Sequence, residues 1–247
     1  MSRKIFNVIL PLVTRKKHLH PIFIMSHIFK KLKTLMHTYS HAWVLLYAFI
    51  YFPWFTYLER HVTDNYFVIH SIFDDYIPFC EYFIIPYLLW FAYIAVTLGY
   101  LFFNDKQGFY KASAIMFSGM TIFLIICTVF PNGLNLRPEV FTRDNFCIEL
   151  VKRIYQTDTP TNVLPSLHVY NSICCYIAIS HCEKLQHSRL IQKGSLVLSI
   201  LIIMSTMFLK QHSVVDVVAA CVMAYFMYSL IYAQEGAKSP RLARQVI

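Results

Sequence analysis

The sequence predicts an all-α, polytopic membrane protein: a bundle of six transmembrane helices preceded by an interfacial amphipathic helix. Apolar residues make up 57% of the 247-residue chain and charged residues only 14%, against about 25% charged in a soluble domain. The mean hydropathy is +0.50. Aromatic residues reach 17%, which is the opposite of a disordered composition. Six apolar stretches then account for most of the chain.

The six stretches are long enough, or nearly so, to span about 30 Å of hydrocarbon, which takes about 20 helical residues. Every backbone polar group in lipid needs an internal partner, so the stretches are predicted to be helices. The first, fourth and fifth are short and must include flanking residues. Pro86 predicts a kink within the second. The stretches cover residues 42–58, 77–103, 110–130, 166–182, 194–209 and 214–233.

The positive charges predict the orientation. With six spans both termini lie on one side, and that side receives most of the 22 Lys and Arg residues. The positive-inside rule therefore places both termini in the cytoplasm, in a multi-pass protein of the cell membrane. The net charge of +9 is then a topology signal, and a nucleic-acid partner is not expected. Residues 1–41 are predicted to be a basic N-terminal segment, 42–233 the membrane domain and 234–247 a basic tail. The other side receives Arg60, Arg137, Arg143, Lys152, Arg153 and Lys210.

Residues 18–37 carry an amphipathic pattern. Apolar side chains recur at steps of three and four residues with lysines off the stripe, and Pro21 suits a first helical turn. The pattern predicts a helix in the cytoplasmic interface of the membrane. A disordered basic arm is the alternative. The stripe consists of Ile22, Met25, Phe29, Leu32 and Met36.

Polar side chains at membrane depth are costly and mark candidate functional positions. The first cluster is Pro165, Ser166, Leu167 and His168, at the start of the fourth stretch. Pro165 suits a helix start and Ser166 can cap it. Free amides at a helix N-terminus suit a phosphate, and His168 lies in the same first turn. The alternative is that His168 is a hydrogen-bonded interface residue.

The second cluster lies where the fifth stretch turns into the sixth. His212 and Asp216 are four residues apart, so a helix brings their side chains together. An ionised Asp216 orients the imidazole of His212 through one ring nitrogen and leaves the other free to attack or to accept a proton. Two ligands are too few for a metal site. A His–Asp pair that only ties two helix ends together is the alternative.

The six-span topology brings both clusters to the same outer face, and Arg137 falls there too, just past the third stretch. Two histidines, a carboxylate and an arginine suit phosphoryl transfer, because they offer a nucleophile, its orienting acid, a proton donor and an oxyanion partner. A transporter would instead place ionisable residues along a path through the midplane. Glu81 lies near this face and is interpreted as an ordinary interface carboxylate; the alternative is that, with Asp74 and Asp75, it shapes the rim of the pocket.

These residues resemble the motifs of the type 2 phosphatidic acid phosphatase superfamily, which are KxxxxxxRP, PSxH and SRxxxxxHxxxD. The stretch PSLH at 165–168 is similar to the second motif. Ser205, His212 and Asp216 have the spacing of the third motif. The resemblance covers about residues 130–218 and, through the six helices, implies the family's membrane fold.

The resemblance implies roles for these residues. His212 would be the nucleophile that forms a phosphohistidine, and Asp216 would orient it. His168 would protonate the leaving alcohol and later activate water or an acceptor alcohol. No metal and no other cofactor is implied. The implied phosphate-binding residues are Arg137, Ser166 and Ser205.

The chain departs from the family pattern at two cationic positions. Phe130 stands where the first motif has Lys, and Thr206 stands where the third has Arg. Lys210, two residues before His212, is expected either to replace a missing phosphate-binding cation or to extend to the membrane interface. The reduced set of cations resembles that of the phosphotransferase relatives, the sphingomyelin and inositol-phosphorylceramide synthases.

The sequence therefore predicts, first, an integral membrane lipid phosphatase. It would hydrolyse a lipid phosphate or pyrophosphate monoester at the outer leaflet through a phosphohistidine. A lipid headgroup phosphotransferase is the second possibility, and an inactive lipid-binding relative is the third. The expected partners are a lipid phosphate substrate and the lipids of the membrane.

Overall fold

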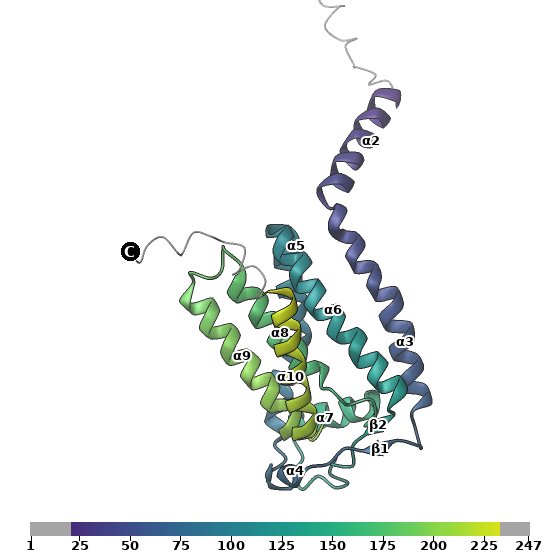
Figure 1. Cartoon of the computed structure of the whole chain (residues 1–247), viewed down its shortest axis with the longest axis vertical. Helices are drawn as coiled ribbons and strands as arrows, with labels where there is room; N and C mark the ends of the chain where they lie inside the picture. Colours follow the sequence, from purple (N-terminus) through teal and green to yellow (C-terminus); the bar gives the residue numbers. More distant parts are fainter. Residues whose placement is uncertain (1–20, 233–247) are drawn as a thin grey trace, which may run out of the picture. The chain divides into compact units, whose positions relative to one another are not determined.

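The computed structural model describes residues 21–232 of the chain (Figure 1). The start of the predicted basic segment, residues 1–20, and the predicted basic tail, 234–247, lie outside the described residues. The chain consists of two units, residues 1–43 and 44–247. In the first unit α2 (Pro21–Thr38) is a helix where the amphipathic pattern predicts one. Its place at a membrane surface stays a prediction.

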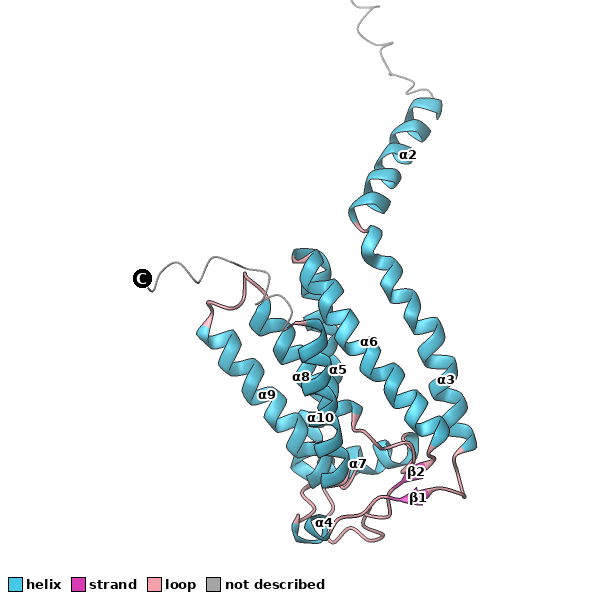
Figure 2. Ribbon diagram, in the orientation of Figure 1, coloured by secondary structure: helices cyan, strands magenta, loops and turns pink. Residues whose placement is uncertain are grey.

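The second unit is mostly helical (Figure 2). Its two short strands, β1 (Phe67–Val68) and β2 (Asn132–Gly133), pair in parallel with Phe67 opposite Asn132. The 3-10 helix η1 (Ser40–Tyr47) begins in the first unit and leads into the second. The remaining helices are α3 (Ala48–His61), α4 (Ile72–Tyr76), η2 (Glu81–Phe83), α5 (Ile84–Asn104), α6 (Lys106–Val129), α7 (Phe146–Thr157), α8 (Leu167–His181), α9 (Arg189–Phe208) and α10 (Val214–Ile231).

Four helical segments of the described chain are long and apolar enough to cross a membrane: Glu81–Asn104, which joins η2 and α5, and the helices α6, α9 and α10. They correspond to the second, third, fifth and sixth predicted stretches. At the first and fourth stretches the helices α3 and α8 have only 14 and 15 residues. The all-α membrane fold class is therefore supported, and the count of six spans stays a prediction.

Helix α8 is central to the bundle, because it contacts α5, α6, α9 and α10. Its residues Val169, Tyr170, Cys174 and Cys175 are fully buried. The Tyr170 hydroxyl donates to the carbonyl oxygen of Ile115 on α6 at 2.6 Å, which brings the tyrosine ring against Gly119. A Cβ atom at residue 119 would lie only 2.1 Å from that ring. This helix crossing therefore requires glycine.

The outward faces of the bundle helices are apolar. Rows of exposed apolar side chains fit a lipid-facing surface better than a water-facing one. The buried core then lies around α8, and the apolar outer faces carry the contact with lipid. The exposed side chains include Ile85, Leu89, Phe91 and Val96 on α5, Leu196, Val197 and Ile200 on α9, and Val218, Val222, Tyr225, Phe226 and Leu230 on α10.

Pro86 lies in the first turn of α5, which begins at Ile84 directly after η2. The amide of a first-turn residue has no partner within the helix, so proline fits here without breaking a hydrogen bond. Pro86 therefore lies at the start of α5 and not in the interior of this helix, where the predicted kink would form.

The short elements gather at one end of the bundle (Figure 1). There α4, β1, β2 and α7 lie near the turn from α9 to α10. Helix α8 also begins at this end, so both polar clusters of the sequence lie here. We call it the loop end of the bundle.

Candidate active site

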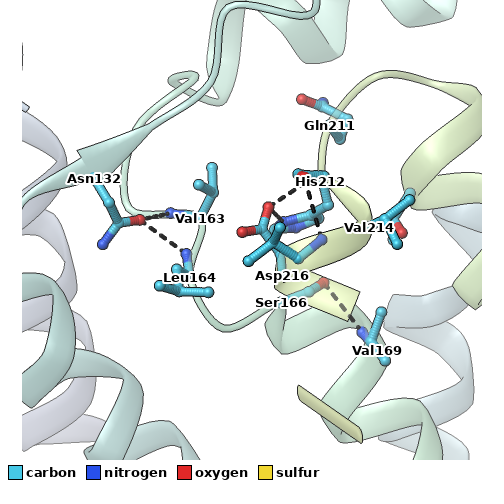
Figure 3. A network of polar contacts seen from close by, with 12 residues as sticks. Asn132, Val163, Leu164, Ser166, Val169, Gln211, His212, Val214 and Asp216 are labelled. Carbon is cyan, nitrogen blue, oxygen red and sulfur yellow. Dashed lines mark hydrogen bonds and ion pairs between the residues drawn. The ribbon is translucent and has the colours of Figure 1, made fainter. Parts of the chain in front are cut away.

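His212 and Asp216 form a buried pair at the turn between α9 and α10 (Figure 3). Nδ1 of His212 lies 3.3 Å from Oδ2 of Asp216, and the two side chains are 9% and 0% exposed. The same carboxylate oxygen accepts a hydrogen bond from the amide of Ser213 at 2.9 Å. Because Nδ1 donates to the carboxylate, the lone pair of the imidazole lies on Nε2. The pair therefore presents a nucleophile or a proton acceptor.

The end of α9 fixes the turn that carries His212. The carbonyl oxygen of Thr206 accepts from the amides of Gln211 at 2.9 Å and His212 at 3.1 Å. Lys210, which lies between Thr206 and Gln211 in the sequence, has a φ of 53°. This left-handed conformation is uncommon for a residue with a side chain. Ser213 then caps α10. This local geometry sets the seven-residue interval between Ser205 and His212.

His168 lies in the first turn of α8 and faces the pair. Ser166 caps this helix, since its hydroxyl accepts from the amide of Val169 at 3.4 Å. The His168 ring packs against Tyr87 and Trp90 of α5, with ring centroids 4.5 and 4.2 Å away. Its centroid is 5.8 Å from that of His212. Nε2 of His168 is buried and has no hydrogen-bond partner in the described part of the chain.

Backbone contacts hold the two clusters together. The amide of Ser166 donates to the carbonyl oxygen of Asp216 at 3.2 Å, which joins the start of α8 to the first turn of α10. Asn132 holds the loop before α8, because its Oδ1 accepts from the amides of Val163 and Leu164, each at 2.9 Å (Figure 3). The position of His168 thus depends on Asn132, which is fully buried.

Asp74 of α4 clamps the other side of the His212 turn. Its Oδ2 accepts from the hydroxyl of Ser213 at 2.6 Å and its Oδ1 from the amide of Val214 at 2.8 Å. Its carbonyl oxygen accepts from Nζ of Lys210 at 2.7 Å. Asp74 is 2% exposed. One buried residue therefore contacts the chain on both sides of His212.

The comparisons with known proteins agree with this arrangement. The model of the PAP2 superfamily matches residues 112–240, which is more than half of the chain and includes both histidines and Asp216. The chain belongs to the PAP2 superfamily. This family generally comprises phosphatases and phosphotransferases. No curated protein and no solved structure matches the chain.

Arg137, the arginine of the first PAP2 motif, contacts protein acceptors in this structure. Its guanidinium donates to the carbonyl oxygens of Tyr155, Asp158 and Thr159 at 2.9–3.2 Å. It also donates to Oε1 of Gln211 at 2.6 Å. Because Oε1 faces the arginine, the amide nitrogen of Gln211 points the other way, and it is buried without a partner in residues 21–232. Burial lowers the pKa of the guanidinium. Arg137 thus orders the loop and orients Gln211.

Two other predicted phosphate-binding residues, Ser205 and Lys210, form contacts within the protein. Ser205 is fully buried, and its hydroxyl donates to the carbonyl oxygen of Ile202 at 2.6 Å. Lys210 contacts Asp74 instead, and burial lowers the pKa of its ammonium group. Phe130, in the place of the motif lysine, packs near Phe67 with ring centroids 5.3 Å apart. The hydroxyl of Thr206, in the place of the motif arginine, donates to the carbonyl oxygen of Ile203 in α9 at 2.8 Å.

A small cavity of about 70 Å³ lies directly beside the two histidines. Two carboxylates line it, Glu59 from the end of α3 and Asp158 from the residue after α7. Burial raises the pKa of the Asp158 carboxyl, although Arg137, His212 and Tyr87 act in the opposite direction. The other lining residues are Phe55, Phe123, Thr159, Thr161, Asn162, Val163, Leu167 and Gln211.

Sequence reasoning did not single out Asn132, Gln211, Glu59 or Asp158, and it considered Asp74 only as part of a pocket rim or as a carboxylate near the interface. Asn132 and Gln211 fall at variable positions of the motifs quoted above, and Glu59, Asp158 and Asp74 lie outside them. The one available signal was the adjacency of Gln211 to His212.

Glu81 is fully buried and pairs with Arg143 at 3.2 Å and with Asn145 at 3.0 Å. Within residues 21–232 no group of three His, Cys, Asp or Glu could hold a metal ion.

Proposed function

We propose that this PAP2 member is an integral membrane enzyme that cleaves a lipid phosphate ester through a phosphohistidine on His212. The observation that carries the proposal is the His212–Asp216 pair facing His168, with both histidines lining one cavity. An oriented imidazole beside a second imidazole provides a nucleophile and a separate proton donor. A His–Asp pair serving only to tie helix ends would need neither the second histidine nor the cavity.

In the first step Nε2 of His212 attacks phosphorus. The P–N bond forms as the P–O bond to the lipid alcohol breaks, and protonated His168 gives its proton to the leaving oxygen. Asp216 stabilises the positive charge that develops on the His212 ring. In the second step water or an acceptor alcohol loses its proton to His168, and its oxygen displaces His212 from phosphorus. His168 is then protonated again and the cycle is complete.

The phosphate oxygens are held by neutral donors in this proposal. The first-turn amides of α8, which follow Ser166, lie at a helix N-terminus and suit an anion. The side-chain amide nitrogen of Gln211 is buried beside the cavity. Arg137 acts through Gln211 as a positioning residue. Ser205 and Lys210 help to hold the turn that carries His212.

The first candidate reaction is hydrolysis of a lipid phosphate or pyrophosphate monoester, with water as the acceptor. The second is transfer of a phospho-headgroup to another alcohol. The second candidate is favoured by Phe130 and Thr206 at the two cationic motif positions, because a dianionic monoester depends on cationic partners. An inactive, lipid-binding relative would retain the fold and lack both reactions.

The proposed topology is that of six spans in the cell membrane, with both termini in the cytoplasm and the loop end outside. Short α3 and α8 cross with their flanking residues, and α8 is surrounded by other helices. Cysteine labelling tests the orientation. A cysteine introduced at Glu149 of α7 is expected to react with an impermeant reagent applied to intact cells, and one introduced at His187, between α8 and α9, is not. The reverse pattern overturns the orientation.

The activity test measures inorganic phosphate and diacylglycerol released by the purified full chain. Substrates are phosphatidate, phosphatidylglycerol phosphate, a polyprenyl pyrophosphate and the phosphodiester phosphatidylethanolamine. His212→Ala is expected to abolish release, and His187→Ala, at an exposed site between α8 and α9, to retain it. Turnover by His212→Ala near the wild-type rate would refute the phosphohistidine mechanism. No product from any substrate favours the inactive relative.

A further inference from the structure

A separate cavity of about 360 Å³ lies in the side of the bundle, between α5, α8 and α9. Its walls belong to the half of the bundle opposite the loop end, where α5 ends and α9 begins (Figure 1). It shares no lining residue with the cavity beside the histidines. It is therefore a different site, and the proposed chemistry does not use it.

The helices α5 and α9 each present one stripe of side chains to this cavity. The stripe on α5 runs from Tyr93 to Tyr100 and that on α9 from Ile191 to Leu198. At 1.5 Å per residue each stripe is about 10 Å long. Gly194 lies in the middle of the α9 stripe, and a Cβ atom there would meet no heavy atom within 4 Å. The missing side chain leaves room beside α9 for a flat, rigid ring system.

The cavity opens toward the apolar outside of the bundle. Val96 of α5 and Ile191 of α9 line it and are 70% and 40% exposed. The segment Glu81–Asn104 and the helix α9 are both long and apolar enough to cross a membrane. An opening between two such helices faces hydrocarbon, which contains no water. The molecule that fills the cavity is therefore a lipid.

The hydroxyl groups of the walls are not equivalent. The hydroxyl of Tyr93 forms hydrogen bonds with those of Ser195 at 2.5 Å and Ser199 at 3.1 Å. Tyr100 is half-buried and lies one turn before α5 ends at Asn104. Its hydroxyl has no hydrogen-bond partner within residues 21–232. A tyrosine near the end of a span lies at the level of the lipid headgroups, so Tyr100 can bond to a polar group of a lipid whose apolar body fills the cavity.

The sequence carries a pattern proposed for sterol contact at this place. Leu98, Tyr100 and Lys106 fit L/V-x₁₋₅-Y-x₁₋₅-K/R. The pattern is short and does not define a site by itself. Here its tyrosine lines a cavity that opens toward lipid. The two observations are independent, because one is a spacing along α5 and the other depends on how three helices pack.

We propose that this cavity binds a sterol. The fused rings lie between the stripes of α5 and α9, against the space left by Gly194, and the sterol hydroxyl forms a hydrogen bond with Tyr100. A rigid ring system loses little conformational freedom on binding, whereas a flexible acyl chain pays to be ordered. An acyl chain also has no hydroxyl for Tyr100. The site thus selects a sterol over the chains of the surrounding phospholipids.

The test is crosslinking of a photoreactive cholesterol analogue to the purified full chain in phosphatidylcholine vesicles, with the labelled residues identified by mass spectrometry. Labelling of residues that line the cavity is expected to saturate, although phosphatidylcholine is in excess. Added cholesterol is expected to suppress this labelling at least about tenfold. The epimer of cholesterol with an inverted hydroxyl is expected to suppress it less, because it cannot bond to Tyr100 in the same pose.

Two variants with matched controls test the residues. Gly194→Leu fills the cavity and is expected to lower the saturable labelling at least about tenfold. Gly99→Leu is its control, since Gly99 does not line the cavity and a Cβ atom there also meets no heavy atom within 4 Å. Tyr100→Phe removes one hydrogen bond and is expected to lower the labelling about fivefold. Its control is Tyr225→Phe, at an exposed tyrosine of α10. Both controls are expected to retain wild-type labelling.

Labelling that does not saturate, or that spreads evenly over the apolar faces of the helices, overturns the sterol site. Equal labelling of Gly194→Leu and Gly99→Leu does the same. A photoreactive phosphatidylcholine that labels the cavity as strongly as the sterol shows that an acyl chain is the occupant, and the proposal is then wrong. Crosslinking requires no catalysis, so none of these results depends on the function proposed for His212.

Discussion

Replacing Asp74 by asparagine tests whether α4 holds the turn that carries His212. Three donors converge on this carboxylate: the amide of Ser71 at 2.8 Å, the hydroxyl of Ser213 at 2.6 Å and the amide of Val214 at 2.8 Å. Asparagine offers one acceptor oxygen. The best arrangement keeps that oxygen on the Ser71 and Ser213 donors and turns the new NH2 group toward the Val214 amide, which then has no acceptor.

The expected cost follows from these contacts. A hydrogen bond to a charged group contributes about 1.5–3 kcal/mol, and a neutral one about 1 kcal/mol. Loss of one charged bond and weakening of the other two lower the free energy of unfolding by about 3 kcal/mol. For a chain of this size 1 kcal/mol corresponds to about 2–4 °C in Tm, so we expect a fall of about 6–12 °C.

The assay is thermal unfolding of the full chain in detergent, with Asp75→Asn as the matched control. Asp75 is adjacent in sequence, but its side chain is 61% exposed, and within residues 21–232 its ion pair is with half-exposed His70. Such surface pairs contribute about 0–1 kcal/mol. A Tm for Asp74→Asn within about 2 °C of the Asp75→Asn value refutes the clamp. At temperatures where the variant is folded, kcat is expected to fall about tenfold, because the turn that carries His212 loses a fixed contact.

Further predictions concern packing, loop position and pH. Gly119→Ala is expected to lower Tm, because overpacking against Tyr170 costs about 1–3 kcal/mol. The control is Gly99→Ala, whose added Cβ would have no heavy atom within 4 Å, and it is expected to leave Tm unchanged or to raise it. Equal changes in Tm for the two variants contradict the close crossing of α6 and α8. Asn132→Ala leaves the amides of Val163 and Leu164 without an acceptor, which lowers the free energy of unfolding by about 1–3 kcal/mol for each. It is also expected to lower kcat, because His168 is displaced. Asn132→Asp keeps the acceptor oxygen and is expected to retain more of both stability and kcat. Burial raises the folded-state pKa of Asp158 above its ordinary 3.8, so the folded state holds this proton more tightly than the unfolded state. The associated stability is therefore complete below about pH 3.8 and is lost as the pH rises through the folded-state pKa. Asp158→Asn should remove this part of the pH dependence of Tm, and an unchanged Tm–pH profile contradicts it.

The sequence was sufficient wherever the determining interactions are local. Hydropathy over some twenty residues identified the long apolar helices α5, α6, α9 and α10, because lipid exposure imposes the same demand on each residue of a span. Ser166 before α8 predicted the cap, since a cap depends on a single helical turn. The four-residue spacing predicted the contact of His212 with Asp216, but His212 precedes the Ser213 cap of α10, so the turn before the helix and not the helix itself brings the two side chains together. The PSLH stretch and the spacing of the third motif gave the family in the same way.

The tertiary structure decided how the two clusters meet and what surrounds them. Asp74 reaches Ser213 across 139 positions, Glu59 reaches Asn162 across 103, and Arg137 reaches Gln211 across 74. Each is a single polar residue in a loop or at a helix end, where no periodic pattern marks its partner. The sequence predicted Arg137 as a free phosphate-binding cation, because a motif specifies a residue type and not the acceptors that folding brings to it. Whether a charge faces a ligand or a carbonyl oxygen depends on the packing of distant segments, and only the folded chain determines it.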